Sequence, residues 1–115
     1  MSASDIPEIT VEAFQSRLHA GGSSLQLIDV REPQEINVAA LQGFQNFPLS
    51  QYQLWQNTIL ETLDPRAETY VLCHHGMRSA QMCAWLIHQG FTQVINIGGG
   101  IDAYSRCVDP SVPRY

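Results

Sequence analysis

The sequence contains no lysine, and all six of its cationic side chains are arginines. This absence excludes chemistry that needs a primary amine, such as Schiff-base catalysis, anchoring of pyridoxal phosphate and the phosphate-binding lysine of nucleotide-binding loops. Positive charge is also scarce overall, because the formal net charge is −5 at pH 7. The charge balance therefore gives no reason to expect nucleic acid as a partner.

Long apolar runs and paired cysteines are missing as well. No apolar stretch approaches the roughly 20 residues that span a bilayer, and the N-terminus lacks a signal-peptide pattern. We therefore expect a cytoplasmic protein with no membrane partner. The three cysteines, Cys73, Cys83 and Cys107, form neither a secreted disulfide framework nor a zinc-type Cys-x-x-Cys pair. We expect reduced thiols and no metal site.

What the sequence does contain is an alternation of strand and helix patterns. Its 115 residues, of which 44% are apolar, predict a single domain over 1–115 with a core at about 8–106 and an extended C-terminal tail. The expected helices are 11–20 capped by Thr10, a turn from Pro33, 51–63 capped by Ser50, 79–89, and one after 98–100. The expected strands are 25–30, 44–49, 69–73 and 94–97. This alternation predicts an α/β fold with a mostly parallel sheet.

The loop between the expected strand 69–73 and the expected helix 79–89 has the sharpest pattern, Cys-His-His-Gly-Met-Arg-Ser at 73–79. Cys73 ends the strand, and the loop runs into a helix N-terminus, whose free amides and dipole favour an anion. Gly76 allows the backbone to turn so that successive N–H groups point inward. With Arg78 as a nearby cation, these features favour a reactive thiolate at Cys73.

This loop resembles the active-site loop of the rhodanese family, Cys-x-x-Gly-x-Arg-Ser. Three further segments resemble family motifs and occur in the family's order: Leu-Ile-Asp-Val-Arg-Glu at 27–32, Asn-Phe-Pro-Leu at 46–49 and Gly-Gly-Ile-Asp-Ala-Tyr at 99–104. The segment 39–44 departs from the family's Gly-His-Ile-Pro-Gly-Ala and keeps only Gly43. The resemblance implies a rhodanese-like three-layer fold, with helices flanking a central sheet.

The resemblance also implies the activity of a thiosulfate sulfurtransferase. Cys73 would accept sulfur from a donor such as thiosulfate and hold it as a persulfide. It would then pass the sulfur to a thiol, a protein acceptor or cyanide, without a metal or an organic cofactor. The residues that would cradle the substrate are His74, His75, Gly76, Met77, Arg78 and Ser79.

Other polar residues are expected in supporting roles. Asp29 is interpreted as a hydrogen-bond acceptor at a strand end. Arg31 either pairs with a carboxylate such as Glu35 or lines the mouth of the pocket. Cys83 falls in an apolar helix and is expected in the core, whereas Cys107 near the tail is either structural or a resolving thiol. His74 and His75 are not expected to bind metal, because three consecutive residues rarely chelate one ion.

Two alternative functions remain open. Cysteine-dependent phosphatases and arsenate reductases resemble this loop, but they place arginine six positions after cysteine, whereas Arg78 stands five positions after Cys73. The other alternative is a non-catalytic rhodanese-like binding or sulfur-relay module. Inactive domains of that kind typically lose the cysteine that this sequence keeps.

Overall fold

The sheet at the centre of the molecule consists of five strands. The computed structural model describes residues 6–115 and arranges the strands in the order β1-β5-β4-β2-β3. The strands are β1 (Glu8–Ile9), β2 (Gln26–Asp29), β3 (Gln45–Asn46), β4 (Thr69–Leu72) and β5 (Val94–Ile97). All four strand pairings within the described residues are parallel. The predicted α/β class with a parallel sheet is therefore confirmed.

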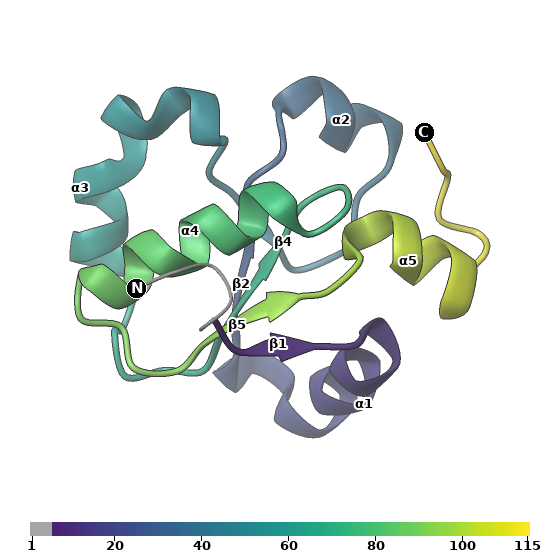
Figure 1. Cartoon of the computed structure of the whole chain (residues 1–115), viewed down its shortest axis with the longest axis horizontal. Coiled ribbons are helices and arrows are strands. Elements are labelled where there is room, and N and C mark those ends of the chain that lie inside the picture. Colours follow the sequence, from purple (N-terminus) through teal and green to yellow (C-terminus); the bar gives the residue numbers. More distant parts are fainter. Residues whose placement is uncertain (1–5) are drawn as a thin grey trace.

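Helices cover both faces of this sheet and complete the three layers (Figure 1). The helices are α1 (Val11–Gly21), α2 (Pro33–Val38), α3 (Tyr52–Thr62), α4 (Met77–His88) and α5 (Gly100–Cys107), with short 3-10 turns at Gly22–Ser24 and Leu49–Gln51. Helices α1 and α5 pack on one face, and α3 and α4 pack on the other. Side-chain alternation along the strands builds these two cores: Val71 joins the α3–α4 side, whereas Tyr70 and Leu72 join the α1–α5 side.

Several element boundaries differ from the sequence prediction. Thr10 caps α1 as expected, accepting a hydrogen bond from the amide of Ala13 at 3.1 Å. Ser50 does not cap α3: its hydroxyl donates to Glu32 at 2.5 Å, and a 3-10 turn leads into the helix instead. Helix α4 begins two residues before the expected position 79, and the strands expected at 25–30 and 44–49 are shorter. Strand β1 was not predicted, because two residues carry no periodic pattern.

The carboxyl ends of the three central strands meet at one edge of the sheet. Here β2 ends at Asp29, β4 leads into Cys73, and β5 leads into the glycine run 98–100. Sites in parallel sheets form at this edge, because the loops that leave the strands converge there. Within residues 6–115, no helix has the length and the apolar character needed to cross a membrane.

Candidate active site

Cys73 lies directly after β4, and its sulfur faces the N-terminus of α4. The Sγ atom accepts a hydrogen bond from the backbone N–H of Gly76 at 3.0 Å and lies 3.3 Å from the Ser79 hydroxyl oxygen. The Cys73 residue is only 1% exposed. Gly76 has φ +104, and a Cβ there would also lie 3.3 Å from the backbone nitrogen of Gly99. Only glycine suits this close turn, which presents its amide to the sulfur.

The carbonyl groups of the loop rest on the first turn of α5. The backbone N–H groups of Ile101 and Asp102 donate to the carbonyl oxygens of Cys73 and His74 at 2.9 and 3.1 Å. A Cβ at Gly100 would come within 2.4 Å of both carbonyl oxygens, so glycine is required for this approach. The glycine run that follows β5 therefore allows the backbone of loop 73–79 to hydrogen-bond to the first turn of α5.

Arg78 turns its side chain outward to Glu35 on α2. Its guanidinium makes two hydrogen bonds to that carboxylate, at 2.6 and 2.9 Å. The Arg78 guanidinium beside Glu35 lowers the pKa of that carboxyl to about 2. The expected cation of the loop is therefore present but already neutralised by a carboxylate, and its main structural effect is to fasten the loop to α2.

Arg31 pairs with Asp29 and not with the Glu35 carboxylate suggested by the sequence. Its guanidinium contacts both Asp29 carboxylate oxygens at 2.7 to 3.1 Å, and its backbone N–H donates to the same carboxylate at 3.0 Å. Both residues are buried, Arg31 completely. Asp29 is thus the strand-end acceptor that was expected, and Arg31 fixes the turn after β2 as a structural ion pair.

The outer rim of the loop carries His74, His75 and Met77. The His74 ring stacks on the ring of Tyr115 in the C-terminal tail, with centroids 4.0 Å apart and an interplanar angle of 6°. Burial lowers the pKa of His74, which favours the neutral imidazole. His75 is exposed, with Nδ1 3.9 Å from an Asp102 carboxylate oxygen, and Met77 is 76% exposed. These three side chains face outward or toward the tail, whereas Gly76 and Ser79 contact the sulfur.

Comparison with known proteins identifies this arrangement. A family model described as Rhodanese-like domain matches residues 10–107. The chain belongs to the rhodanese-like family. Its fold agrees with this assignment: a rhodanese-like domain protein from Staphylococcus aureus superimposes with a TM-score of 0.75 at 21% identity, covering 96% of this chain and 99% of that one.

Rhodanese-like relatives differ in how much of their length this chain matches. The Arabidopsis thaliana protein Rhodanese-like/PpiC domain-containing protein 12, chloroplastic, is 48% identical over 112 residues, which are 96% of this chain and 38% of the relative. Putative sulfur carrier protein YrkF of Bacillus subtilis is 36% identical, and the match covers 87% of this chain and 51% of the length of YrkF. A protein named Sulfurtransferase from Allochromatium vinosum is 32% identical, and the match covers 88% of this chain and 90% of that protein. The chain thus spans well under two thirds of the first two relatives and most of the third.

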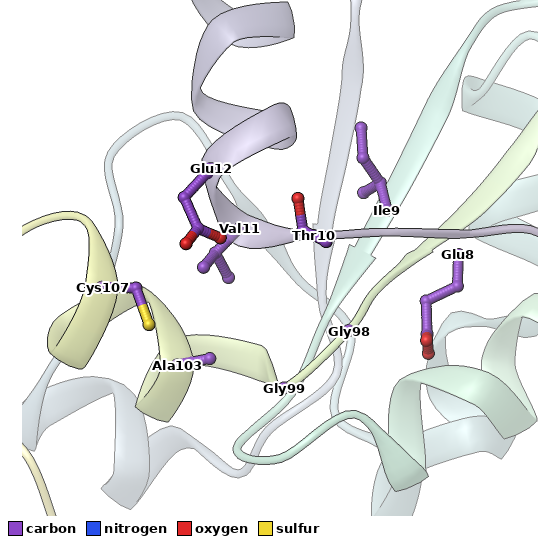
Figure 2. Close-up of a pocket in the computed structure, with 9 residues that line it drawn as sticks. All are labelled: Glu8, Ile9, Thr10, Val11, Glu12, Gly98, Gly99, Ala103 and Cys107. Atoms are coloured by element: carbon purple, nitrogen blue, oxygen red, sulfur yellow. The ribbon is translucent and has the colours of Figure 1, made fainter.

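The other two cysteines of the rhodanese-like chain lie in different surroundings. Cys83 is fully buried on α4, as expected for a core residue, and burial raises the pKa of its thiol to about 12. Cys107 is exposed at the end of α5. It lines a cavity of about 310 Å³ between β1, α1 and α5, whose lining includes no residue of loop 73–79 (Figure 2).

Two residues near the site escaped the sequence reasoning. Asn96 on β5 is only 3% exposed and contacts both Gly76 and Ser79. A polar residue inside the apolar strand pattern 94–97 is the signal that could have singled it out. Tyr115 reaches the site from the tail, which was predicted only to be extended, and nothing in its local sequence indicates that contact.

Proposed function

We propose that this protein is a sulfurtransferase that moves sulfane sulfur from a donor such as thiosulfate to a thiol or cyanide, through a persulfide on Cys73. One observation carries the proposal. The Cys73 sulfur lies at the N-terminus of α4 and accepts the Gly76 N–H at 3.0 Å, an arrangement that favours a negatively charged sulfur. Cys83, with a thiol pKa of about 12, would remain protonated and unreactive.

The reaction has two steps that balance without a metal or an organic cofactor. The Cys73 thiolate attacks the outer sulfur of thiosulfate, a sulfur–sulfur bond forms, and sulfite leaves with the electron pair of the broken bond. An acceptor thiolate or cyanide then attacks the terminal sulfur, and the electron pair returns to Cys73. In this proposal the backbone of the loop from His74 to Ser79 curves around the donor, and the Gly76 amide stabilises the charge on sulfur.

The environment of Arg78 argues against the phosphatase alternative. A phosphate needs cationic and amide donors around three oxygens, but the Arg78 guanidinium is held by both oxygens of Glu35. The loop is also one residue shorter between cysteine and arginine than in the phosphatase families. The binding-module alternative is weakened because Cys73 is retained together with its Gly76 and Ser79 contacts.

The acceptor of this sulfur is proposed to be either a small thiol or a protein. Relatives named sulfur carrier protein and Sulfurtransferase support transfer between proteins in this family. We propose the cytoplasm as the location because all three cysteines are free thiols; the chloroplastic name of the Arabidopsis thaliana relative describes that protein. We also propose that residues 1–115 act as one domain.

Intact-mass measurement after incubation with thiosulfate tests the nucleophile. The wild type should gain the mass of one sulfur atom, and cyanide should remove it. Cys73→Ala should abolish both the gain and the turnover. Cys83→Ala is the matched control, because it also removes a buried thiol and should keep the activity apart from a loss of stability. Full turnover by Cys73→Ala would overturn the assignment.

A further inference from the structure

Asn96 is a buried polar residue in an otherwise apolar strand. It lies on β5 with Glu8 of β1 and Val71 of β4 as its neighbours in the sheet register, and it is 3% exposed. Burying a side-chain amide is unfavourable unless its polar atoms find hydrogen-bond partners. The partners of Asn96 therefore determine how its amide is oriented.

Two acceptors fix that orientation. The Asn96 amide nitrogen donates to the carbonyl oxygen of Gly76 at 3.1 Å and to a carboxylate oxygen of Glu8 at 3.3 Å. A flipped amide would place its oxygen against two other oxygens, and neither could donate. The Asn96 oxygen must therefore face the remaining neighbour, the Ser79 hydroxyl, at 2.5 Å.

This arrangement decides where the single hydroxyl proton of Ser79 points. The Ser79 oxygen lies 2.5 Å from the Asn96 amide oxygen and 3.3 Å from the Cys73 sulfur. The amide oxygen carries no hydrogen, so the shorter contact requires Ser79 to donate to it. Ser79 then presents a lone pair, and not its proton, to the Cys73 sulfur.

We infer that Asn96 is a positioning residue that competes with the Cys73 sulfur for the Ser79 proton. A thiolate has no proton on that sulfur, so Ser79 can stabilise it only by turning its proton away from Asn96. When an acceptor takes the terminal sulfur of a persulfide, the electron pair returns to the Cys73 sulfur, and the same turn of the hydroxyl is needed to stabilise it. Asn96 therefore slows release of the terminal sulfur to the acceptor, an inference that rests on the proposed persulfide chemistry.

Alkylation of the sulfur-free protein with iodoacetamide at one fixed pH tests the direction of the hydroxyl. The rate at Cys73 is read by peptide mass spectrometry, with the exposed Cys107 of the same molecule as reference. Asn96→Ala frees the Ser79 proton for the thiolate and should raise the Cys73 rate about five- to tenfold, the scale of one hydrogen bond to a charged group. In a Ser79→Ala background, the same substitution should change the rate less than about twofold.

A second variant separates this effect from a loosened loop. Asn96→Asp keeps an acceptor oxygen toward Ser79, and its second oxygen lies between the Gly76 carbonyl and the Glu8 carboxylate, where it takes a proton and donates as the amide nitrogen does. Alkylation of Cys73 should therefore change less than about twofold in this variant. A general loosening of the loop would speed alkylation in both variants. A raised rate for the alanine variant beside a nearly unchanged rate for the aspartate variant is the expected result, and equal increases would overturn the inference.

The release role is tested by loading the protein with thiosulfate and following persulfide loss to dithiothreitol. Asn96→Ala should speed this transfer about five- to tenfold, because the freed hydroxyl stabilises the thiolate that Cys73 becomes as the terminal sulfur leaves. Asn46→Ala is the matched control: it removes an amide that donates to the backbone carbonyls of Asp29 and Arg31 at 2.9 Å each, away from the sulfur. It should lower stability and leave both rates unchanged.

Two outcomes would refute the inference, and they are distinguishable from failure of the proposed function. An Asn96→Ala effect that persists in full without the Ser79 hydroxyl would show that Asn96 does not act through Ser79. Unchanged or slower persulfide transfer in Asn96→Ala would overturn the release role. A wild type that takes up no sulfur would overturn the proposed function and the release role together, whereas alkylation would still decide the proton's direction.

Discussion

The hydroxyl group of Tyr115 ties the C-terminal tail to Arg31 and to Glu35 on α2, and Tyr115→Phe removes that tie while it keeps the ring. The hydroxyl accepts from an Arg31 guanidinium nitrogen and donates to a Glu35 carboxylate oxygen, each at 2.8 Å. Burial raises the pKa of Tyr115 to about 12, so the hydroxyl remains a donor at neutral pH. The phenylalanine ring can still stack on His74.

The expected loss of stability follows from the burial of the two partners. Tyr115 is 40% exposed, so water can replace its contact with Glu35 at little cost. Arg31 is completely buried, and the other contact of the same guanidinium nitrogen is the Glu35 carbonyl at 3.5 Å, beyond ordinary hydrogen-bond length. Leaving that donor unpaired should lower the free energy of unfolding by about 1–2 kcal/mol.

Urea unfolding at neutral pH measures this loss. Tyr52→Phe is the matched control, because Tyr52 is 39% exposed and its hydroxyl makes no hydrogen bond within the described residues 6–115. It should change the free energy of unfolding by less than about 0.5 kcal/mol. If Tyr115→Phe is no less stable than Tyr52→Phe, the tail is not fastened through Arg31, and this reasoning is wrong.

Two further predictions concern charge and loop length. The Glu35 carboxyl, with its pKa lowered from 4.5 to about 2 by Arg78, should stabilise the fold by about 3 kcal/mol at neutral pH, and this contribution is lost as the pH falls from about 4.5 to 2. In Glu35→Gln that part of the acid dependence of urea unfolding should disappear, and a wild-type acid profile in the variant would contradict the assignment. The loop from Cys73 to Arg78 should also be too short to surround a phosphate group. The wild type should therefore cleave an aryl phosphate far more slowly than it turns over thiosulfate. One glycine inserted after Gly76 should impair sulfur transfer and favour oxyanions, and phosphatase activity through Cys73 equal to thiosulfate turnover would refute the loop-length argument.

The sequence located the candidate active-site loop at 73–79 because the features that define it are local. A strand, a glycine and a helix N-terminus within seven residues place Cys73 against the Gly76 amide, and this was predictable. The partners of the loop's side chains were harder to predict, because they depend on tertiary contacts. Arg78 and Glu35 are 43 positions apart, and the sequence offered no rule for choosing between that carboxylate and solvent.

The same reasoning explains the misassigned and missed residues. Arg31 has three carboxylates within four positions, and only the turn after β2 decides that Asp29 receives the guanidinium. Asn96 contacts Gly76 across 20 positions, through the register of β5 beside β4. Tyr115 reaches Arg31 across 84 positions, and its place follows from the path of the whole tail.

The two outer strands of the sheet, β1 and β3, have only two residues each, whereas the three inner strands have four. An outer strand exposes unpaired backbone donors and acceptors, which can recruit a strand from another molecule and start aggregation. Two residues offer too short a template for such recruitment. A domain with such short edge strands can therefore exist at high concentration, or be joined in tandem to other folded domains, without its sheet pairing with the sheet of a neighbour.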